Sequence, residues 1–148
     1  LTGSLPTELG LATSLRDFRF SNNWITGPIP TELGLIDLGY FEAANNQLTG
    51  TLPETLAFWH EGYNPVYRFD IANNDLTGTI PPSLGPLATT STSEDYKIEV
   101  FNVSGNSFSG QIPKGWCTID PMVFDFDCAT SSTTNSSSSL CGCSCACN

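Results

Sequence analysis

The chain has 148 residues, of which 39% are hydrophobic and 14% are charged, and this length fits one folded domain. The sequence contains 5 Lys and Arg residues and 15 Asp and Glu residues, and its formal net charge of −10 disfavours nucleic acid and anionic membranes as partners. Apolar residues come in short runs, so we expect no direct membrane insertion. Ser, Thr and Asn supply much of the polarity, as in many secreted proteins.

One short phrase recurs along the chain: an apolar residue, Thr or Ser, then Gly, with an apolar-Pro pair following at a fixed offset. The copies are Leu1-Thr2-Gly3, Ile25-Thr26-Gly27, Leu48-Thr49-Gly50, Leu76-Thr77-Gly78 and Phe108-Ser109-Gly110. Their starts are 24, 23, 28 and 32 residues apart. Periods of this length indicate a repeat protein in which each repeat forms one coil of a solenoid.

Each phrase after the first closes a longer frame of apolar residues that contains an Asn. Alternating apolar positions, such as Phe18 and Phe20, predict a short strand with one face turned inward. An inward Asn can bond main-chain groups that the following turn leaves open. The frame therefore predicts a structural ladder of amides at Asn23, Asn46, Asn74 and Asn106.

This frame, combined with Leu-Thr-Gly-x-Ile-Pro, resembles the plant-type leucine-rich-repeat family, which includes receptor-like and secreted repeat proteins of plants, algae and diatoms. The resemblance covers residues 1–116 as about four to five coils, the first one partial. It implies an α/β-type solenoid with short parallel strands on the concave face and short helical turns and loops on the convex face. It also implies an extracellular recognition or adhesion scaffold.

The two longest periods exceed a 24-residue repeat, and the surplus falls around residues 57–64 and 86–97. Repeat proteins tolerate insertions in loops on one face. We therefore expect both surplus segments to bulge from the convex side and to leave the stacking surfaces intact.

Residues 117–148 form a Cys- and Ser-rich segment, for which we expect a disulfide-rich C-terminal cap. Its close Cys spacing does not suit zinc, which prefers two to four intervening residues. The connectivity stays open because six cysteines allow 15 pairings. Phe124 is among the apolar residues that can cover the last coil. The disulfide candidates are Cys117, Cys128, Cys141, Cys143, Cys145 and Cys147.

No catalytic residue, cofactor or metal site is expected. The histidine His60 lies in the first surplus segment, and the chain has no nucleophile elbow, zinc-protease helix or phosphate-binding Gly-rich loop. Asp120, Asp125 and Asp127 offer carboxylates to a hard cation, but their spacing matches no known calcium loop. The sequence therefore predicts a protein that is not an enzyme.

The outward positions of the predicted strands form the candidate ligand surface, with Tyr40 flanked by Asp17 and Arg68 at its centre. The alternative interpretation is a solvated face whose opposite charges offset one another. The candidate binding residues are Asp17, Arg19, Tyr40, Glu42, Arg68, Asp70 and Asn102.

Two Asn-x-Ser acceptors make Asn102 and Asn135 candidates for glycosylation. Asn135 lies in the Ser- and Thr-rich segment and is the more accessible of the two. A glycan on Asn102 would block part of the candidate ligand surface.

Recognition of a protein, peptide or glycan, outside the cell, is the leading functional hypothesis. Under this hypothesis the chain is a secreted protein, a cell-surface protein or the ectodomain of a larger protein. The alternative is self-association, because the chain opens in mid-repeat at Leu1 and copies can pack head-to-tail on the uncovered first coil, where Leu5 and Leu9 face inward. A remote alternative is ice binding through the column of Thr2, Thr26, Thr49, Thr77 and Ser109.

Overall fold

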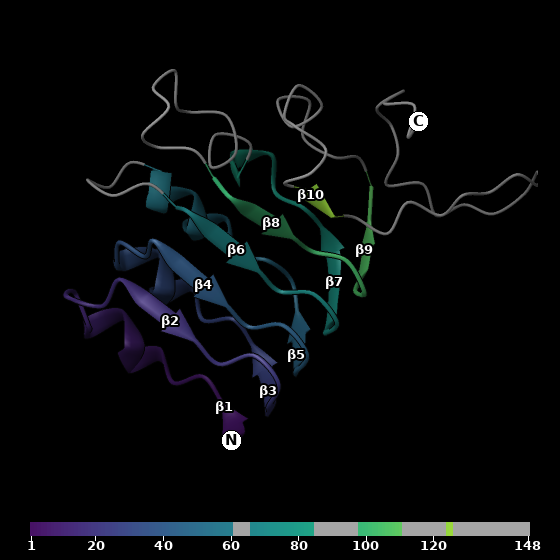
Figure 1. The fold of residues 1–148 in the computed structure, drawn as a ribbon, viewed down its shortest axis with the longest axis horizontal. Helices are drawn as coiled ribbons and strands as arrows, with labels where there is room; N and C mark the ends of the chain where they lie inside the picture. Colours follow the sequence, from purple (N-terminus) through teal and green to yellow (C-terminus); the bar gives the residue numbers. More distant parts are fainter. Residues whose placement is uncertain (61–65, 85–97, 111–123, 126–148) are drawn as a thin grey trace, which may run out of the picture.

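The structure is a computed structural model, and it describes residues 1–60, 66–84, 98–110 and 124–125. Within these residues the chain winds into successive coils, each with one strand in each of two parallel sheets (Figure 1). The concave sheet, named for its place in the predicted solenoid, contains β2 (Asp17–Arg19), β4 (Tyr40–Glu42), β6 (Arg68–Asp70), β8 (Val100–Asn102) and β10 (Phe124–Asp125). The lateral sheet contains β1 (Thr2–Ser4), β3 (Trp24–Pro28), β5 (Gln47–Gly50), β7 (Asp75–Thr79) and β9 (Ser107–Ser109).

Neighbouring strands in each sheet come from consecutive coils and run parallel, in the order β10-β8-β6-β4-β2 and β1-β3-β5-β7-β9. This arrangement confirms the predicted solenoid. The concave sheet also continues past residue 116, because β10 pairs with β8 and Phe124 takes the register position of Phe101. A strand of the same sheet therefore lies inside the segment that the sequence assigns to the cap.

The core of the solenoid contains a column of phenylalanine rings, one from each of β2, β4, β6 and β8. Phe18, Phe41, Phe69 and Phe101 occupy matching register positions. The ring centroids of consecutive members lie 6.0, 5.8 and 5.0 Å apart. These are the separations at which aromatic rings attract one another.

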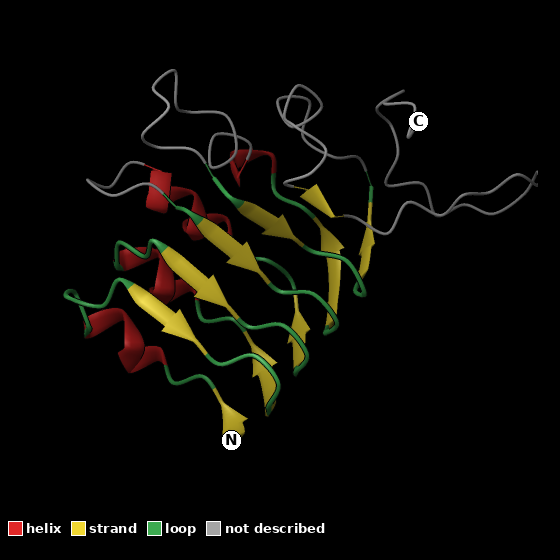
Figure 2. Ribbon diagram, viewed as in Figure 1, coloured by secondary structure: helices red, strands yellow, loops and turns green. Residues whose placement is uncertain are grey.

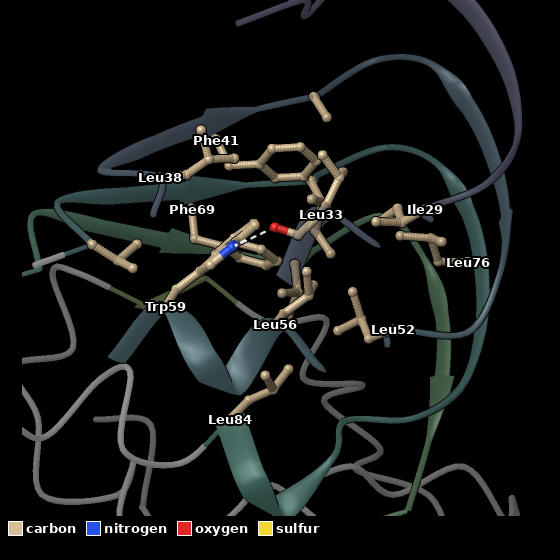
Figure 3. Packing of buried hydrophobic residues seen from close by; sticks show 14 of the residues in the cluster. Ile29, Leu33, Leu38, Phe41, Leu52, Leu56, Trp59, Phe69, Leu76 and Leu84 are labelled. Carbon is tan, nitrogen blue, oxygen red and sulfur yellow. Dashed lines mark hydrogen bonds between the residues drawn. The ribbon is translucent and has the colours of Figure 1, made fainter. Parts of the chain in front are cut away.

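Trp59 packs into this core, although it belongs to the first surplus segment. Its side chain is 1% exposed and lies between Phe41 and Phe69, with centroid distances of 5.6 and 6.1 Å (Figure 3). The indole Nε1 donates a 2.8 Å hydrogen bond to the carbonyl of Leu33. The expectation that this segment only bulges outward is wrong at this residue, because the surplus brings an aromatic side chain into the space between two coils.

Short 3-10 helices stack on one another along the solenoid, on the side of the coils that carries neither sheet (Figure 2). They are η1 (Thr7–Leu11), η2 (Thr31–Leu35), η3 (Glu54–His60) and η4 (Pro82–Leu84). The stacking is close: a Cβ on Gly10 would lie 2.6 Å from the carbonyl oxygen of Glu32, and one on Gly34 would collide with the carbonyl of Thr55. The first two helices therefore require glycine at the point where the next helix crosses.

The lateral sheet does not stack equivalent threonines directly over one another. Thr26 pairs in register with Ser4 in the preceding strand and with Gln47 in the next strand, so equivalent positions shift by two residues per coil. The Thr26 hydroxyl donates to the carbonyl of Gly3 at 3.3 Å, and that of Thr77 donates to Gly50 at the same distance. The straight threonine column expected for ice binding is thus absent from the described strands.

Candidate functional site

The centre of the candidate ligand surface lies on β2, β4 and β6 of the concave sheet. Strand pairing places Tyr40 beside Asp17 on one side and Arg68 on the other. The same pairing places Glu42 between Arg19 and Asp70. Successive side chains of a strand point to opposite faces, so the phenylalanines between these residues enter the core and the polar residues face outward.

An ionic network joins the charged residues of this surface. Arg19 Nε donates a 2.6 Å hydrogen bond to Asp17 Oδ1 and lies 3.5 Å from Glu42 Oε1. Arg68 Nε lies 3.4 Å from the same Glu42 oxygen, outside hydrogen-bond geometry. The hydrogen bond from Arg19 to Asp17 raises the pKa of the Arg19 guanidinium, and the charges of Asp17 and Glu42 act in the same direction. Arg19 therefore stays cationic.

The aromatic part of the site is a stack of three planar groups across the same strands. Arg19 Cζ lies 4.5 Å from the centroid of the Tyr40 ring, a cation–π contact. Tyr40 in turn stacks on Tyr67, with centroids 5.5 Å apart and an interplanar angle of 24°. Tyr67 precedes the first residue of β6, so counting outward strand positions missed it. The signal in the sequence was an aromatic residue directly before Arg68.

The remaining candidate residues make local bonds instead of joining this cluster. Asp70 Oδ1 accepts a 3.2 Å hydrogen bond from the Ala72 amide. Asn102 Oδ1 accepts from both the amide and the hydroxyl of Ser104, at 3.1 and 2.7 Å. Both residues use a carboxyl or amide oxygen to bond the turn that follows their own strand. The cluster with mutual contacts consists of Asp17, Arg19, Tyr40, Glu42, Tyr67 and Arg68, and is referred to below as the Tyr40 cluster.

The predicted ladder asparagines lie at the turns between the two sheets. Asn74 Oδ1 accepts from the Leu48 amide at 2.9 Å, while its Nδ2 donates to the carbonyls of Ala43 and Ile71 at 3.0 Å. Asn46 and Asn106 make the corresponding bonds one coil away on either side. Asn23 donates to the carbonyls of Phe20 and Ser21.

Several predicted residues lie outside the described part of the chain. They are Asn135 and the six disulfide candidates Cys117, Cys128, Cys141, Cys143, Cys145 and Cys147. Among the described residues, His, Cys, Asp and Glu form no group of three or more that would hold a metal ion. The described helices are all too short or too polar to cross a membrane.

The first coil presents the apolar residues on which the self-association hypothesis depends. Leu5 and Leu9 are partly buried and pack against the core. Leu1 is largely exposed.

Comparison with known proteins agrees with this geometry. Residues 14–36, 66–87 and 97–119 match the family model Leucine Rich Repeat. A comparison with curated protein sequences finds no match.

Solved structures with this fold include ectodomains from Arabidopsis thaliana. The BIR2 ectodomain has 27% identity and a TM-score of 0.65, with 83% of this chain and 60% of that chain covered. A chain of the BIR3–SERK2 complex has 24% identity, a TM-score of 0.67 and the same two coverages. The receptor kinase HAESA ectodomain, in complex with an extended IDA peptide hormone, has 29% identity and a TM-score of 0.65, with 83% and 19% covered.

This chain thus spans 60% or less of the length of those proteins. The repeats matched by the family model, the two parallel sheets and these similarities lead to one conclusion. The chain folds as a leucine-rich-repeat solenoid.

Proposed function

We propose that this chain is an extracellular, non-enzymatic recognition module that binds a peptide or a protein segment through the Tyr40 cluster. We also infer that its repeats are of the plant type. The proposal is supported by the three stacked planar groups of Arg19, Tyr40 and Tyr67, which lie within reach of acidic and basic side chains on an accessible sheet. Two similar structures support it: HAESA was solved in complex with a peptide hormone ligand, and the plant peptide hormone receptor RGFR1 in complex with RGF2.

The ion pair between Arg19 and Asp17 has little structural role. Arg19 and Asp17 are about half exposed, and exposed ion pairs contribute roughly 0–1 kcal/mol to stability. The Arg19 guanidinium and the Asp17 carboxylate are therefore available to pair with a ligand at small cost to the fold. Stacked aromatic side chains supply apolar contact area, and they lose little conformational entropy on binding because they have few rotatable bonds. Tyr and Arg also contribute much of the binding energy at many protein interfaces.

Selection from a display library of random peptides tests the proposal. The library is selected on the immobilised chain, and each enriched peptide is measured against variants. We expect related sequences whose affinity falls at least about tenfold, ~1.4 kcal/mol, in Tyr40→Ala and in Arg68→Ala. Thr49→Ala, an exposed change on the lateral sheet, serves as the matched control and should leave affinity unchanged.

Two results would contradict the proposal: enriched peptides that bind the Tyr40→Ala chain as well as the original, or no enrichment at all. Sedimentation of the isolated chain separates recognition from self-association. The recognition proposal expects a monomer over the whole concentration range. Larger species that vanish when Leu5 or Leu9 is replaced by Asp would support head-to-tail packing instead.

A further inference from the structure

A second surface, remote from the Tyr40 cluster, lies on the stacked 3-10 helices. Each of the first three helices has an inward leucine and, two residues later, an outward apolar residue. Leu33 and Leu56 are fully buried, whereas Leu11, Leu35 and Phe58 are 80%, 66% and 51% exposed. Since η1 contacts η2 and η2 contacts η3, these exposed residues form a row along the solenoid, here termed the convex apolar row.

Acidic side chains border this row. Glu8, Glu32 and Glu54 lie in the first turn of η1, η2 and η3. Glu8 precedes Leu11 by three residues, as Glu32 precedes Leu35, and side chains three apart on a 3-10 helix lie on the same face. The helical sequences TELGL, TELGL and ETLAFWH contain no Lys or Arg. The surface is therefore apolar with an anionic border.

The residues of this row do not belong to the buried core. The neighbouring positions already fill the core with Leu33, Leu56 and Trp59, and the exposed side chains keep half or more of their surface in contact with solvent. A contiguous exposed apolar patch with a polar border marks an interaction site in many proteins.

We propose that the convex apolar row binds a cationic amphipathic segment of a partner protein. Its apolar side chains would cover Leu11, Leu35 and Phe58, while its Lys or Arg side chains would pair with the three bordering glutamates. The charge pattern decides between occupants. A second copy of this chain, with a formal net charge of −10, would bring further negative charge to the anionic border and be repelled. A basic segment would instead pair its positive charges with the glutamates.

The test uses a synthetic amphipathic peptide of about 18 Leu and Lys residues in a helical pattern. A peptide of the same composition in scrambled order has the same charge but no apolar face. Titration calorimetry measures both against the full chain. We expect the amphipathic peptide to bind at least about tenfold more tightly than the scrambled one, with affinity falling as salt is raised.

Three variants locate the site. The triple change Leu11→Ser, Leu35→Ser and Phe58→Ser should weaken binding at least about tenfold, whereas Trp24→Ser, at an apolar residue 66% exposed on the lateral sheet, should not. Circular dichroism of the triple variant checks that the fold is kept.

The triple change Glu8→Gln, Glu32→Gln and Glu54→Gln should weaken binding and reduce its salt dependence. The double change Glu8→Gln and Glu32→Gln is compared with a control that removes the same amount of charge elsewhere, through Asp75→Asn and Glu99→Gln. Equal weakening in this control would overturn the proposal, because the peptide would then respond to net charge alone. Equal binding of the scrambled peptide, or loss of binding in Tyr40→Ala, would also overturn it, the latter by placing the peptide on the concave sheet.

Discussion

Replacing Asn74 with Ala tests whether the turn asparagines hold consecutive coils together. The change removes the acceptor for the Leu48 amide and the donor for the carbonyls of Ala43 and Ile71. A stranded buried donor such as the Leu48 amide costs about 1–3 kcal/mol. The carbonyls of Ala43 and Ile71 keep second donors in Asn46 and Asn106. We therefore expect a loss of about 2 kcal/mol in the free energy of unfolding.

Urea denaturation followed by circular dichroism measures this loss, and a thermal scan should show a midpoint about 5–10 °C lower. Gln47→Ala is the control, because Gln47 is exposed beside Leu48 in the preceding coil and should change the free energy by less than about 0.5 kcal/mol. An Asn74→Ala chain as stable as the original would refute the reasoning, since it would mean that water or a shifted turn satisfies the Leu48 amide.

Trp59→Ala should cost about 3–5 kcal/mol, because it empties the space between Phe41 and Phe69 and leaves the Leu33 carbonyl with the Ile36 amide as its donor. Urea titration would show a lower midpoint, and an unchanged midpoint would count against the packing in Figure 3. Gly34→Ala should cost about 1–3 kcal/mol by driving η2 away from η3, and differential scanning calorimetry should detect it. All six cysteines should be oxidised, so intact mass spectrometry under non-reducing conditions should find a mass lower by six hydrogens; free thiols or a bound zinc ion would contradict the expected cap.

The arrangement of coils was predictable from the sequence because it depends on local spacing. Phe18 and Phe20 alternate with polar residues, and the same frame recurs near Phe41, Phe69 and Phe101, so the register of the concave sheet follows from aligning the copies. The spacing of residues along the chain cannot reveal how segments from different coils pack against one another. Trp59 belongs to a segment of surplus length, and its burial depends on a space that two separate coils create.

The parts of the sites that the sequence analysis missed depend on geometry between coils. Tyr67 lies one residue before its strand, and only the path of the chain brings its ring onto Tyr40. The two-residue offset between Thr26 and the equivalent threonines of the neighbouring lateral strands is set by strand pairing, which equivalent positions in a repeat do not encode.

Hydrogen exchange measured by mass spectrometry, with and without a library-selected peptide, tests the central claim most directly. Recognition through the Tyr40 cluster predicts slower exchange of the segments that contain β2, β4 and β6, with no change in η1, η2 or η3. Protection restricted to the helices or to the lateral sheet would contradict the claim and place the ligand on another face of the solenoid.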